Sequence, residues 1–299
     1  MNCLVVTADD FGLAREVNEA VEIGFTQGIL SAASLMVSAA HADNAVSRAM
    51  RLPRLRVGLH LALADAEPVL PQKQIPRLVD RSGRLRSDLA LLGLDLAVSE
   101  AAREQLRAEI EAQFLAFRAT GLPLDHVNVH RHFHLHPIVA AMVIDTAAQF
   151  GARALRVPRE PHGIVRSGDF GRDIVVDICC GLLTKRAERR GVFMPDAVFG
   201  LGWSGRLTRN RLRYLLERLP CGFTEIYLHP ATRDVFRGHA PGYRYLEELE
   251  ALLDPTNLEA LRRSGARLGG YQDALAALGR TAERCQNRDS PEPTGWPVV

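Results

Sequence analysis

The sequence predicts an α/β protein in which parallel strands form a barrel. Short apolar runs rich in branched side chains alternate with longer amphipathic stretches, which is typical of strands that are each followed by a covering helix. Roughly seven or eight such runs occur along the chain, which favours a barrel over an open sheet. We expect one domain over residues 1–277 and a C-terminal tail over residues 278–299.

The expected strands are short apolar runs bounded by polar or turn-forming residues. In chain order they are Leu4–Val6, Ser34–Val37, Val57–Leu61, His126–His130, Ala154–Val157, Ala197–Leu201, Glu225–Leu228 and Arg267–Gly269. The clearest helices are Arg15–Gln27, Glu100–Thr120, Pro137–Phe150, Thr208–Leu219 and Tyr245–Leu253. In the second helix, spacings of three and four relate Leu106, Ile110 and Phe114, which predicts one buried stripe.

Two long stretches interrupt the repeat of strands and helices. Asp65–Leu96 contains three prolines and two glycines, and Glu160–Gly191 is a second excursion with helical character in part. Long loops in compact domains are usually functional. Because the first excursion closely follows a strand that carries a histidine, we consider it a candidate lid.

The composition excludes several classes of protein. The 37 Lys and Arg against 35 Asp and Glu leave a net charge of +2, too balanced for a broad nucleic-acid surface. The five cysteines lack a CxxC spacing, which argues against a thiolate zinc site and a disulfide framework. No run reaches the roughly 18 apolar residues that a membrane span needs. We expect a soluble, cytoplasmic protein with a small or neutral partner, leaving open its oligomeric state and peripheral contact with the inner face of the membrane.

Two adjacent carboxylates, Asp9 and Asp10, follow the first expected strand. In parallel α/β folds the carboxyl ends of the strands face the active site, so both acids are placed for chemistry. A helix cap would account for one Asp but not for the other. Two carboxylates held close repel each other, and a metal bound by one relieves the repulsion and leaves the other free as a base.

Histidine is concentrated in one segment, because five of the ten histidines fall between His126 and His136. The period of two along a strand puts His126, Asn128 and His130 on one side. His132 continues the same alternation. Neutral imidazole is a favoured ligand for zinc and similar ions, and the alternative is a histidine-rich surface loop that binds metal nonspecifically.

Asp10, His60 and His130 each follow or end a different expected strand and could converge on one divalent ion. Two imidazoles and a carboxylate, with positions left open for substrate and water, are what a hydrolytic metal site requires. The ligand types favour zinc and are compatible with magnesium, manganese or cobalt. His229 ends a late strand, where it is either a further ligand or a general acid.

Five more residues are candidates for supporting the site or binding substrate. Arg156 and Glu160 lie at the end of another strand, where they could orient a base or hold a substrate hydroxyl; a surface ion pair is the alternative. Asn128 and His132 come from the histidine-rich strand. Trp203 could stack on a sugar ring or be a structural core residue.

Four sequence blocks, in this order, resemble the YdjC-like carbohydrate deacetylase family, which includes the chitooligosaccharide deacetylases. They are Thr-Ala-Asp-Asp-Phe-Gly at 7–12, Gly-Leu-His-Leu at 58–61, the histidine-rich segment 126–136 and Leu-His-Pro at 228–230. The resemblance covers about residues 3–273. Further blocks at 16–21, 32–37 and 229–233 are similar to the hopanoid-biosynthesis-associated branch of the family.

The resemblance implies an irregular TIM-barrel-like (β/α) barrel with one divalent metal ion. The positions that match the family's metal ligands are Asp10, His60 and His130, and those that match its base and acid are Asp9 and His229. The implied reaction removes acetate from an N-acetylated amino sugar. For the hopanoid branch this sugar is an N-acetylglucosamine attached to a hopanoid lipid, and a chitooligosaccharide is the alternative substrate.

The chain departs from the family in one place. Many relatives carry Asp-Ser-His where this chain has Asn128-Val129-His130. An Asn can orient a histidine by hydrogen bonding, but it lacks the charge that would complete a carboxylate–histidine pair. The role of Asn128 is therefore open at this point.

Two other functions fit parts of the pattern. A metal-dependent phosphoester hydrolase uses the same ligand types, but it would need more basic residues at the mouth of the site than the sequence places there. A carbohydrate- or lipid-binding barrel without activity would have no use for a paired base and acid.

Overall fold

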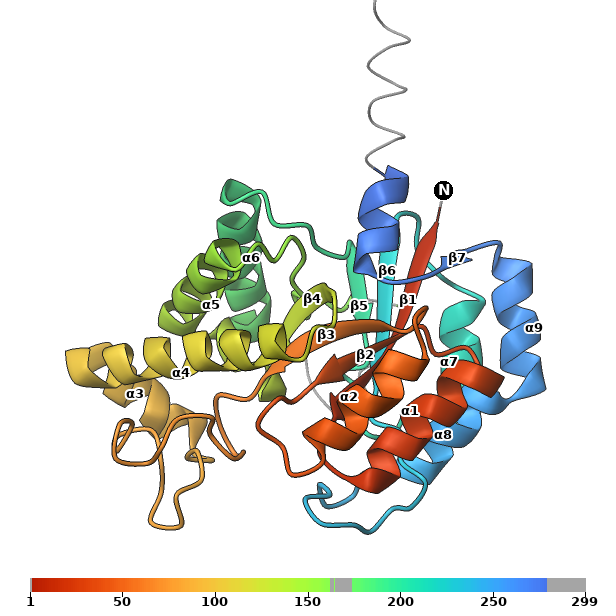
Figure 1. Cartoon of the computed structure of the whole chain (residues 1–299). Coiled ribbons are helices and arrows are strands. Elements are labelled where there is room, and N and C mark those ends of the chain that lie inside the picture. Colours follow the sequence, from red (N-terminus) through yellow and green to blue (C-terminus); the bar gives the residue numbers. More distant parts are fainter. Residues whose placement is uncertain (1, 162–163, 165–173, 279–299) are drawn as a thin grey trace, which may run out of the picture.

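The computed structural model describes residues 2–161, 164 and 174–278, which form a curled parallel sheet surrounded by helices (Figure 1). The strands lie in the order β4-β3-β2-β1-β6-β5, and β7 pairs with the start of β1. In chain order the strands are β1 (Cys3–Phe11), β2 (Ala32–Leu35), β3 (Arg56–Leu61), β4 (Leu124–Val129), β5 (Ala197–Phe199), β6 (Phe223–Leu228) and β7 (Arg267–Leu268). All pairings between these strands are parallel, as the alternation with helices predicts.

The helices cover the outside of the curled sheet, with α3 to α6 grouped at one end of it (Figure 1). They are α1 (Arg15–Gln27), α2 (Ala42–Arg51), α3 (Leu89–Val98), α4 (Glu100–Ala119), α5 (Pro137–Gln149), α6 (Ile174–Arg189), α7 (Arg209–Leu216), α8 (Tyr245–Leu253) and α9 (Pro255–Ser264), with the 3-10 segment η1 (His130–Leu135) after β4. Residues 271–278 are also helical. In the described part of the chain, no helix is long and apolar enough to cross a membrane.

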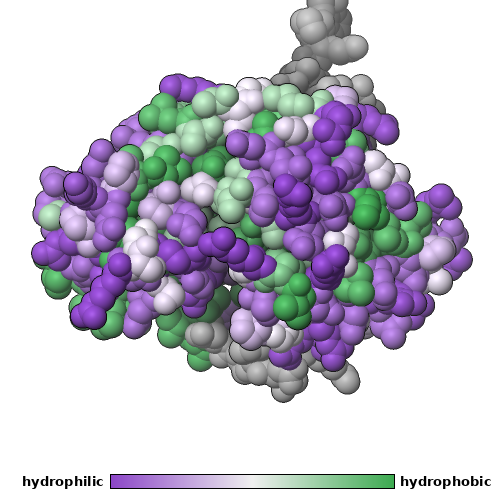
Figure 2. All heavy atoms as spheres, turned by 60° about the horizontal axis from the view of Figure 1, so that its bottom comes forward, coloured by the Kyte–Doolittle hydropathy of each residue, from purple (hydrophilic) through white to green (hydrophobic). Residues whose placement is uncertain are grey.

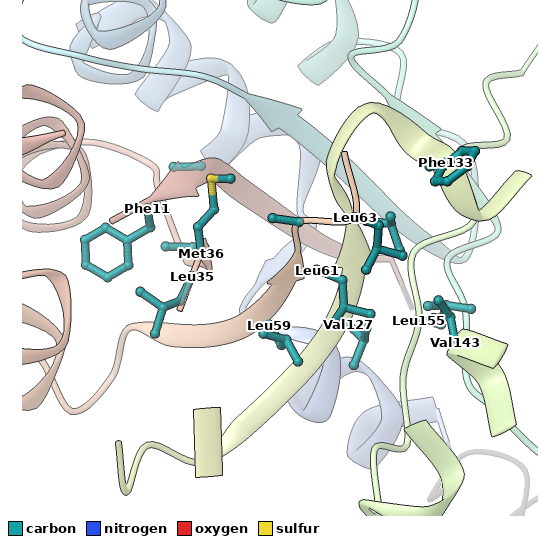
Figure 3. Packing of buried hydrophobic residues seen from close by; sticks show 14 of the residues in the cluster. Phe11, Leu35, Met36, Leu59, Leu61, Leu63, Val127, Phe133, Val143 and Leu155 are labelled. Carbon is teal, nitrogen blue, oxygen red and sulfur yellow. The ribbon is translucent and has the colours of Figure 1, made fainter. Parts of the chain in front are cut away.

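Side chains alternate between an apolar outer layer and a polar interior. Leu59 and Leu61 of β3 pack with Val127 of β4 in the apolar cluster shown in Figure 3. Because successive residues of a strand face opposite sides, His60 and Asn128 point the other way, toward the inside of the curl. Both are almost fully buried. The interior of this barrel is therefore filled by polar side chains, and they need partners there.

The expected strand Ala154–Val157 is wrong, although the segment does run between the two ends of the sheet. Leu155 pairs with Val127 and Ala154 pairs with Phe193, each through an isolated bridge. The segment crosses from one neighbour to the other without running along either, so no ladder forms. The sheet is consequently a half-barrel that isolated bridges close, rather than a complete ring of strands.

Most other expected elements are present with shifted ends. Strand β1 continues to Phe11 rather than ending at Val6, and β4 ends at Val129 rather than His130. The predicted stripe on α4 is confirmed, because Leu106, Ile110 and Phe114 are all buried. The tail after residue 278 and much of the segment between Glu160 and α6 lie outside the described residues.

The excursion Asp65–Leu96 is tied to α4 by a buried carboxylate. Glu109 accepts hydrogen bonds from the backbone N–H groups of Val69 (2.8 Å) and Leu70 (2.9 Å). The excursion ends in α3, whose first turn is capped by the Asp88 side chain. These contacts satisfy backbone groups that an irregular segment would otherwise leave unpaired. A role for the excursion as a lid stays a prediction.

Candidate active site

The end of β1 brings both predicted acids to the inside of the barrel. Neighbouring residues of a regular strand face opposite sides. Asp10, however, has a left-handed backbone with φ of 62°, and the pairing of β1 with β2 shifts register between Ala8 and Phe11. This irregularity re-aims one side chain, so that Asp9 and Asp10 both point into the site. A positive φ in a non-glycine residue is costly and persists only where the surroundings enforce it.

Three ligand atoms converge at the carboxyl ends of β1, β3 and β4. Asp10 Oδ1 lies 3.3 Å from His60 Nε2 and 3.2 Å from His130 Nδ1, and the two imidazole nitrogens are 3.3 Å apart. The three residues form a group that could hold a metal ion. Ligands about 2.0–2.1 Å from one tetrahedral ion must themselves lie roughly 3.3 Å apart. The spacing therefore fits a single divalent ion.

The bonding of Asp10 supports the same conclusion. Asp10 Oδ1 is buried and, within the part of the chain that the structure describes, has no hydrogen-bond partner of acceptable geometry, although two imidazole nitrogens lie close to it. Buried polar atoms are rarely left without a partner. Burial raises the pKa of Asp10, but His130 and His60 outweigh it and hold the pKa well below its ordinary value. An ionised carboxylate beside two imidazoles is a suitable ligand set for a cation.

Asn128 orients one of these ligands. Its Oδ1 lies 2.6 Å from His60 Nδ1, while its Nδ2 donates to Asp9 Oδ1 at 3.1 Å. Asp9 as a carboxylate only accepts, so the amide nitrogen must face it and the amide oxygen must face His60. His60 therefore carries a proton on Nδ1, and its Nε2 faces Asp10. A neutral amide thus fixes the ligand as a carboxylate would.

Arg156 is the second side chain that holds Asp9. Its guanidinium donates to Asp9 Oδ2 at 2.5 Å and to Asp9 Oδ1 at 3.0 Å, and neither side chain is appreciably exposed. Burial raises the pKa of Asp9, but the charge of Arg156, followed by that of His60, holds it far below its ordinary value. Asp9 is therefore permanently ionised near neutral pH. The alternative of a surface ion pair is wrong for Arg156, which is fully buried.

A second carboxylate, which was not predicted from the sequence, completes the environment of Arg156. Glu225 of β6 accepts from Arg156 Nε and Nη2, both at 2.8 Å, and from the Thr7 hydroxyl at 2.7 Å. The Tyr271 hydroxyl also donates to it. The signal that could have identified Glu225 is a charged residue in the middle of an apolar strand, since such a charge is almost never buried without a partner.

His229 directly follows β6. Its imidazole contacts the ring of Tyr243 at 5.1 Å between centroids, and its Nδ1 has no hydrogen-bond partner among the described residues. Burial lowers the pKa of His229, with opposing effects from Asp10 and Asp9. The backbone N–H of His229 donates to Glu248 of α8 at 2.5 Å, which anchors the strand end.

The histidines after His130 support the site from η1 rather than from a strand. Arg131 and His132 both have φ of 53°, so the expected strand alternation is wrong beyond Val129. His132 Nε2 instead forms a hydrogen bond with the Tyr227 hydroxyl (2.9 Å), and His134 Nε2 forms one with the carbonyl oxygen of Arg156 (2.9 Å). Burial lowers the pKa of His134 to about 4, so this histidine is neutral.

Of the two remaining candidates, Trp203 lies on the loop after β5, and Glu160 contacts that loop from another segment. Glu160 accepts the N–H groups of Gly200 and Gly202, each at 3.0 Å, and so holds that loop; no contact of Glu160 with Asp9 is found among the described residues. Trp203 is half-buried, with the Arg211 guanidinium 5.1 Å from its ring centroid. A role for Trp203 in stacking on sugar stays a prediction.

Comparison with known proteins gives the family of this fold and site. The model of the YdjC-like protein family matches residues 3–263, and the chain belongs to that family. A carbohydrate deacetylase of Geobacillus stearothermophilus is 32% identical over 273 residues, which cover 90% of this chain and 96% of the relative. A chitooligosaccharide deacetylase of Serratia marcescens is 27% identical, with 90% and 98% covered.

Among solved structures, a candidate cellobiose-phosphate cleavage protein of Enterococcus faecalis V583 superimposes with a TM-score of 0.72. The two chains are 23% identical, and the match covers 91% of this chain and 99% of the other. This likeness shows that the curled α/β sheet and its helices are arranged in the same way in both proteins.

Replacing Arg156 by Met should destabilise the protein by about 3–5 kcal/mol at neutral pH, because two buried carboxylates lose their cation. The difference in stability between the wild type and Arg156→Met should become smaller as the pH falls toward about 4, since Asp9 without its arginine can take up a proton. Urea unfolding at several pH values measures both effects. Arg159→Met is the matched control: Arg159 is exposed, its side chain bonds only the carbonyl oxygen of Asp196 among the described residues, and its replacement should lower the stability little. Equal costs for both variants would contradict the account.

Glu248 should make stability depend on pH. Burial raises its pKa from 4.5 to about 7, so the folded state holds a proton that the unfolded state has lost. Stability from this group is present below pH 4.5 and is lost as the pH rises to about 7, by about 3 kcal/mol at most. The stability of the wild type relative to Glu248→Gln should therefore fall across this window. The exposed neighbour Glu247, replaced by Gln, should show no such trend.

Proposed function

We propose that this protein is a divalent-metal-dependent hydrolase that removes the N-acetyl group from an N-acetylglucosamine-type sugar. The observation that carries the proposal is the convergence of Asp10, His60 and His130 at 3.2–3.3 Å beside the ionised carboxylate of Asp9. Membership of the YdjC-like family and the deacetylase names of full-length relatives support the reaction class.

Asp10, His60 and His130 would hold the ion, and zinc is the ion we favour for this ligand set. When bound, the ion supplies Lewis acidity toward the acetamide carbonyl and toward water. The chain's own contribution is to keep one carboxylate, that of Asp9, outside the group of metal ligands so that it can act as a base. Asp9 keeps its charge because of Arg156. Among the described residues its Oδ2 accepts a hydrogen bond from Arg156 alone, so it retains a lone pair for the proton of an attacking water.

His229 is suited to the opposite task of protonating the departing amine. An amine leaves poorly unless a proton reaches the nitrogen as the bond to the acyl carbon breaks. The imidazole is buried against Tyr243, its Nδ1 has no partner in the described structure, and Asp10 and Asp9 both favour its protonated form. The base and the acid thus come from β1 and β6, which are neighbouring strands.

For the substrate we propose an N-acetylglucosaminyl hopanoid lipid, with a chitooligosaccharide as the second candidate. The sequence blocks at 16–21, 32–37 and 229–233 support the lipid. So does an apolar face on α3, where Leu91, Leu94 and Val98 are 56%, 61% and 76% exposed. The face of the molecule at the carboxyl ends of the strands mixes hydrophilic and hydrophobic patches (Figure 2). The name of the Serratia marcescens relative supports the oligosaccharide.

Asp9→Asn should bind metal yet lose nearly all turnover, because an amide cannot accept the proton from water. Metal content and acetate release from an N-acetylglucosaminyl substrate are the two measurements. Asp10→Asn is the matched variant, one residue away, and it should lose metal as well as activity. If metal content and activity fell in parallel in Asp9→Asn, the roles given to Asp9 and Asp10 would be wrong.

His60→Ala should lose the metal itself, since one of three protein ligands disappears. An unchanged metal stoichiometry in this variant would remove His60 from the site.

Substrate choice can be tested by measuring acetate release from an N-acetylglucosaminyl lipid and from a chitooligosaccharide, each with and without chelator. We expect chelator-sensitive release with the lipid substrate preferred. Preference for the oligosaccharide would overturn the lipid assignment alone. Release from neither substrate would favour a binding barrel without activity.

A further inference from the structure

A second polar cluster lies directly behind the metal-ligand group, inside the barrel. Ser34 Oγ is 3.0 Å from His126 Nε2, and His126 Nδ1 is 2.9 Å from Asp125 Oδ2. This is the order of groups in a serine hydrolase. Here, however, Ser34 and His126 are completely buried and Asp125 nearly so, so no substrate can reach the hydroxyl.

The hydroxyl of Ser34 is also committed to another partner. Asn128 Nδ2 donates to Ser34 Oγ at 2.8 Å, and the same amide group contacts Asp9 and His60. The cluster is therefore joined to the candidate active site by one amide. The cluster therefore acts on the position of Asn128 and does not serve in nucleophilic attack.

The position of every proton in this chain of hydrogen bonds follows from its two ends. Asp125 can only accept, so His126 carries its proton on Nδ1 and accepts at Nε2. The Ser34 hydroxyl must then donate to His126, which leaves its oxygen to accept from Asn128. At the other end Asp9 can only accept, so it takes the second N–H of the same amide. The amide oxygen is left for one partner alone, His60 Nδ1.

We propose that Asp125, His126 and Ser34 form a positioning relay that locks the Asn128 amide and thereby holds His60 in the tautomer that presents Nε2 to a metal ion. With both amide hydrogens committed, the amide cannot rotate by half a turn without breaking two buried hydrogen bonds. A neutral Asn in this place then orients its histidine as firmly as a charged group would, without adding a third carboxylate beside Asp9 and Asp10.

The surroundings of the relay are shaped to hold the His126 ring. A Cβ on Gly58 would lie 2.5 Å from that ring, so only glycine at this point of β3 leaves room for it. Tyr271 stacks on the ring with centroids 4.5 Å apart. Asp125 also accepts the backbone N–H groups of Tyr271 and Gln272, which fixes the far end of the relay.

The relay is tested first on the metal-free wild-type protein by ¹⁵N NMR of its imidazole rings. In both His126 and His60 the Nδ1 atom should carry a proton, with His60 assigned by its absence in His60→Gln. Finding Nδ1 of His60 without a proton would overturn the proposal. This readout needs neither turnover nor a folded variant of the relay residues.

Ser34→Ala then removes the central hydroxyl. The His60 signals should shift toward an average of two tautomers, and the dissociation constant for Zn²⁺ alone, measured by competition with a chromogenic chelator, should rise about tenfold. Thr224→Val is the matched control, because it also removes a buried strand hydroxyl, one without a hydrogen-bond partner in the described structure. Unchanged signals and Zn²⁺ affinity in Ser34→Ala would contradict the relay.

The proposal rests on the proposed function only in taking His60 as a metal ligand. Suppose that Nδ1 carries a proton in both His126 and His60 and that Ser34→Ala weakens Zn²⁺ binding, but that the protein releases no acetate. This result would contradict the deacetylase assignment and leave the relay standing. Acetate release by a protein in which Nδ1 of His60 has no proton would contradict the relay and leave the deacetylase assignment standing.

Discussion

The buried guanidinium of Arg156 is the interaction on which the interior of this protein depends. It lies between two carboxylates, Asp9 and Glu225, and none of the three has more than a trace of exposed surface. Charges moved out of water are costly unless partners and hydrogen bonds replace the water. The cation over Tyr227, 4.3 Å from its ring centroid, and the hydrogen bonds from other strands provide that replacement.

This arrangement divides the acids of the barrel into two kinds. Asp9 and Glu225 both bond to the Arg156 guanidinium. Asp10, one residue away, lies beside the imidazoles of His60 and His130 instead, and in the described structure its Oδ1 has no hydrogen-bond partner, so a cation held by these three residues would balance its charge. The strained backbone at Asp10 is what permits two neighbouring acids to enter one cavity with different partners.

Much of the arrangement could be predicted from sequence because it follows from periodicity. Alternation along β4 placed Asn128 on the same side as His126, and position at strand ends brought Asp10, His60 and His130 to one edge. Expectations were wrong where local backbone leaves the regular pattern, as at His132 and at Ala154–Val157. Neither the turn after Val129 nor the isolated bridges carry a periodic signal. Glu225 was missed because its partner, Arg156, lies far away in the chain.

The central claim is that Asp10, His60 and His130 hold the ion that the reaction needs. Anomalous X-ray diffraction from crystals of the metal-loaded protein tests it most directly, because it locates the ion without reference to activity. The account predicts one strong anomalous peak within about 2.0–2.3 Å of one atom of each of these three residues. A peak bound elsewhere, with these three side chains still bonded only to one another, would contradict it.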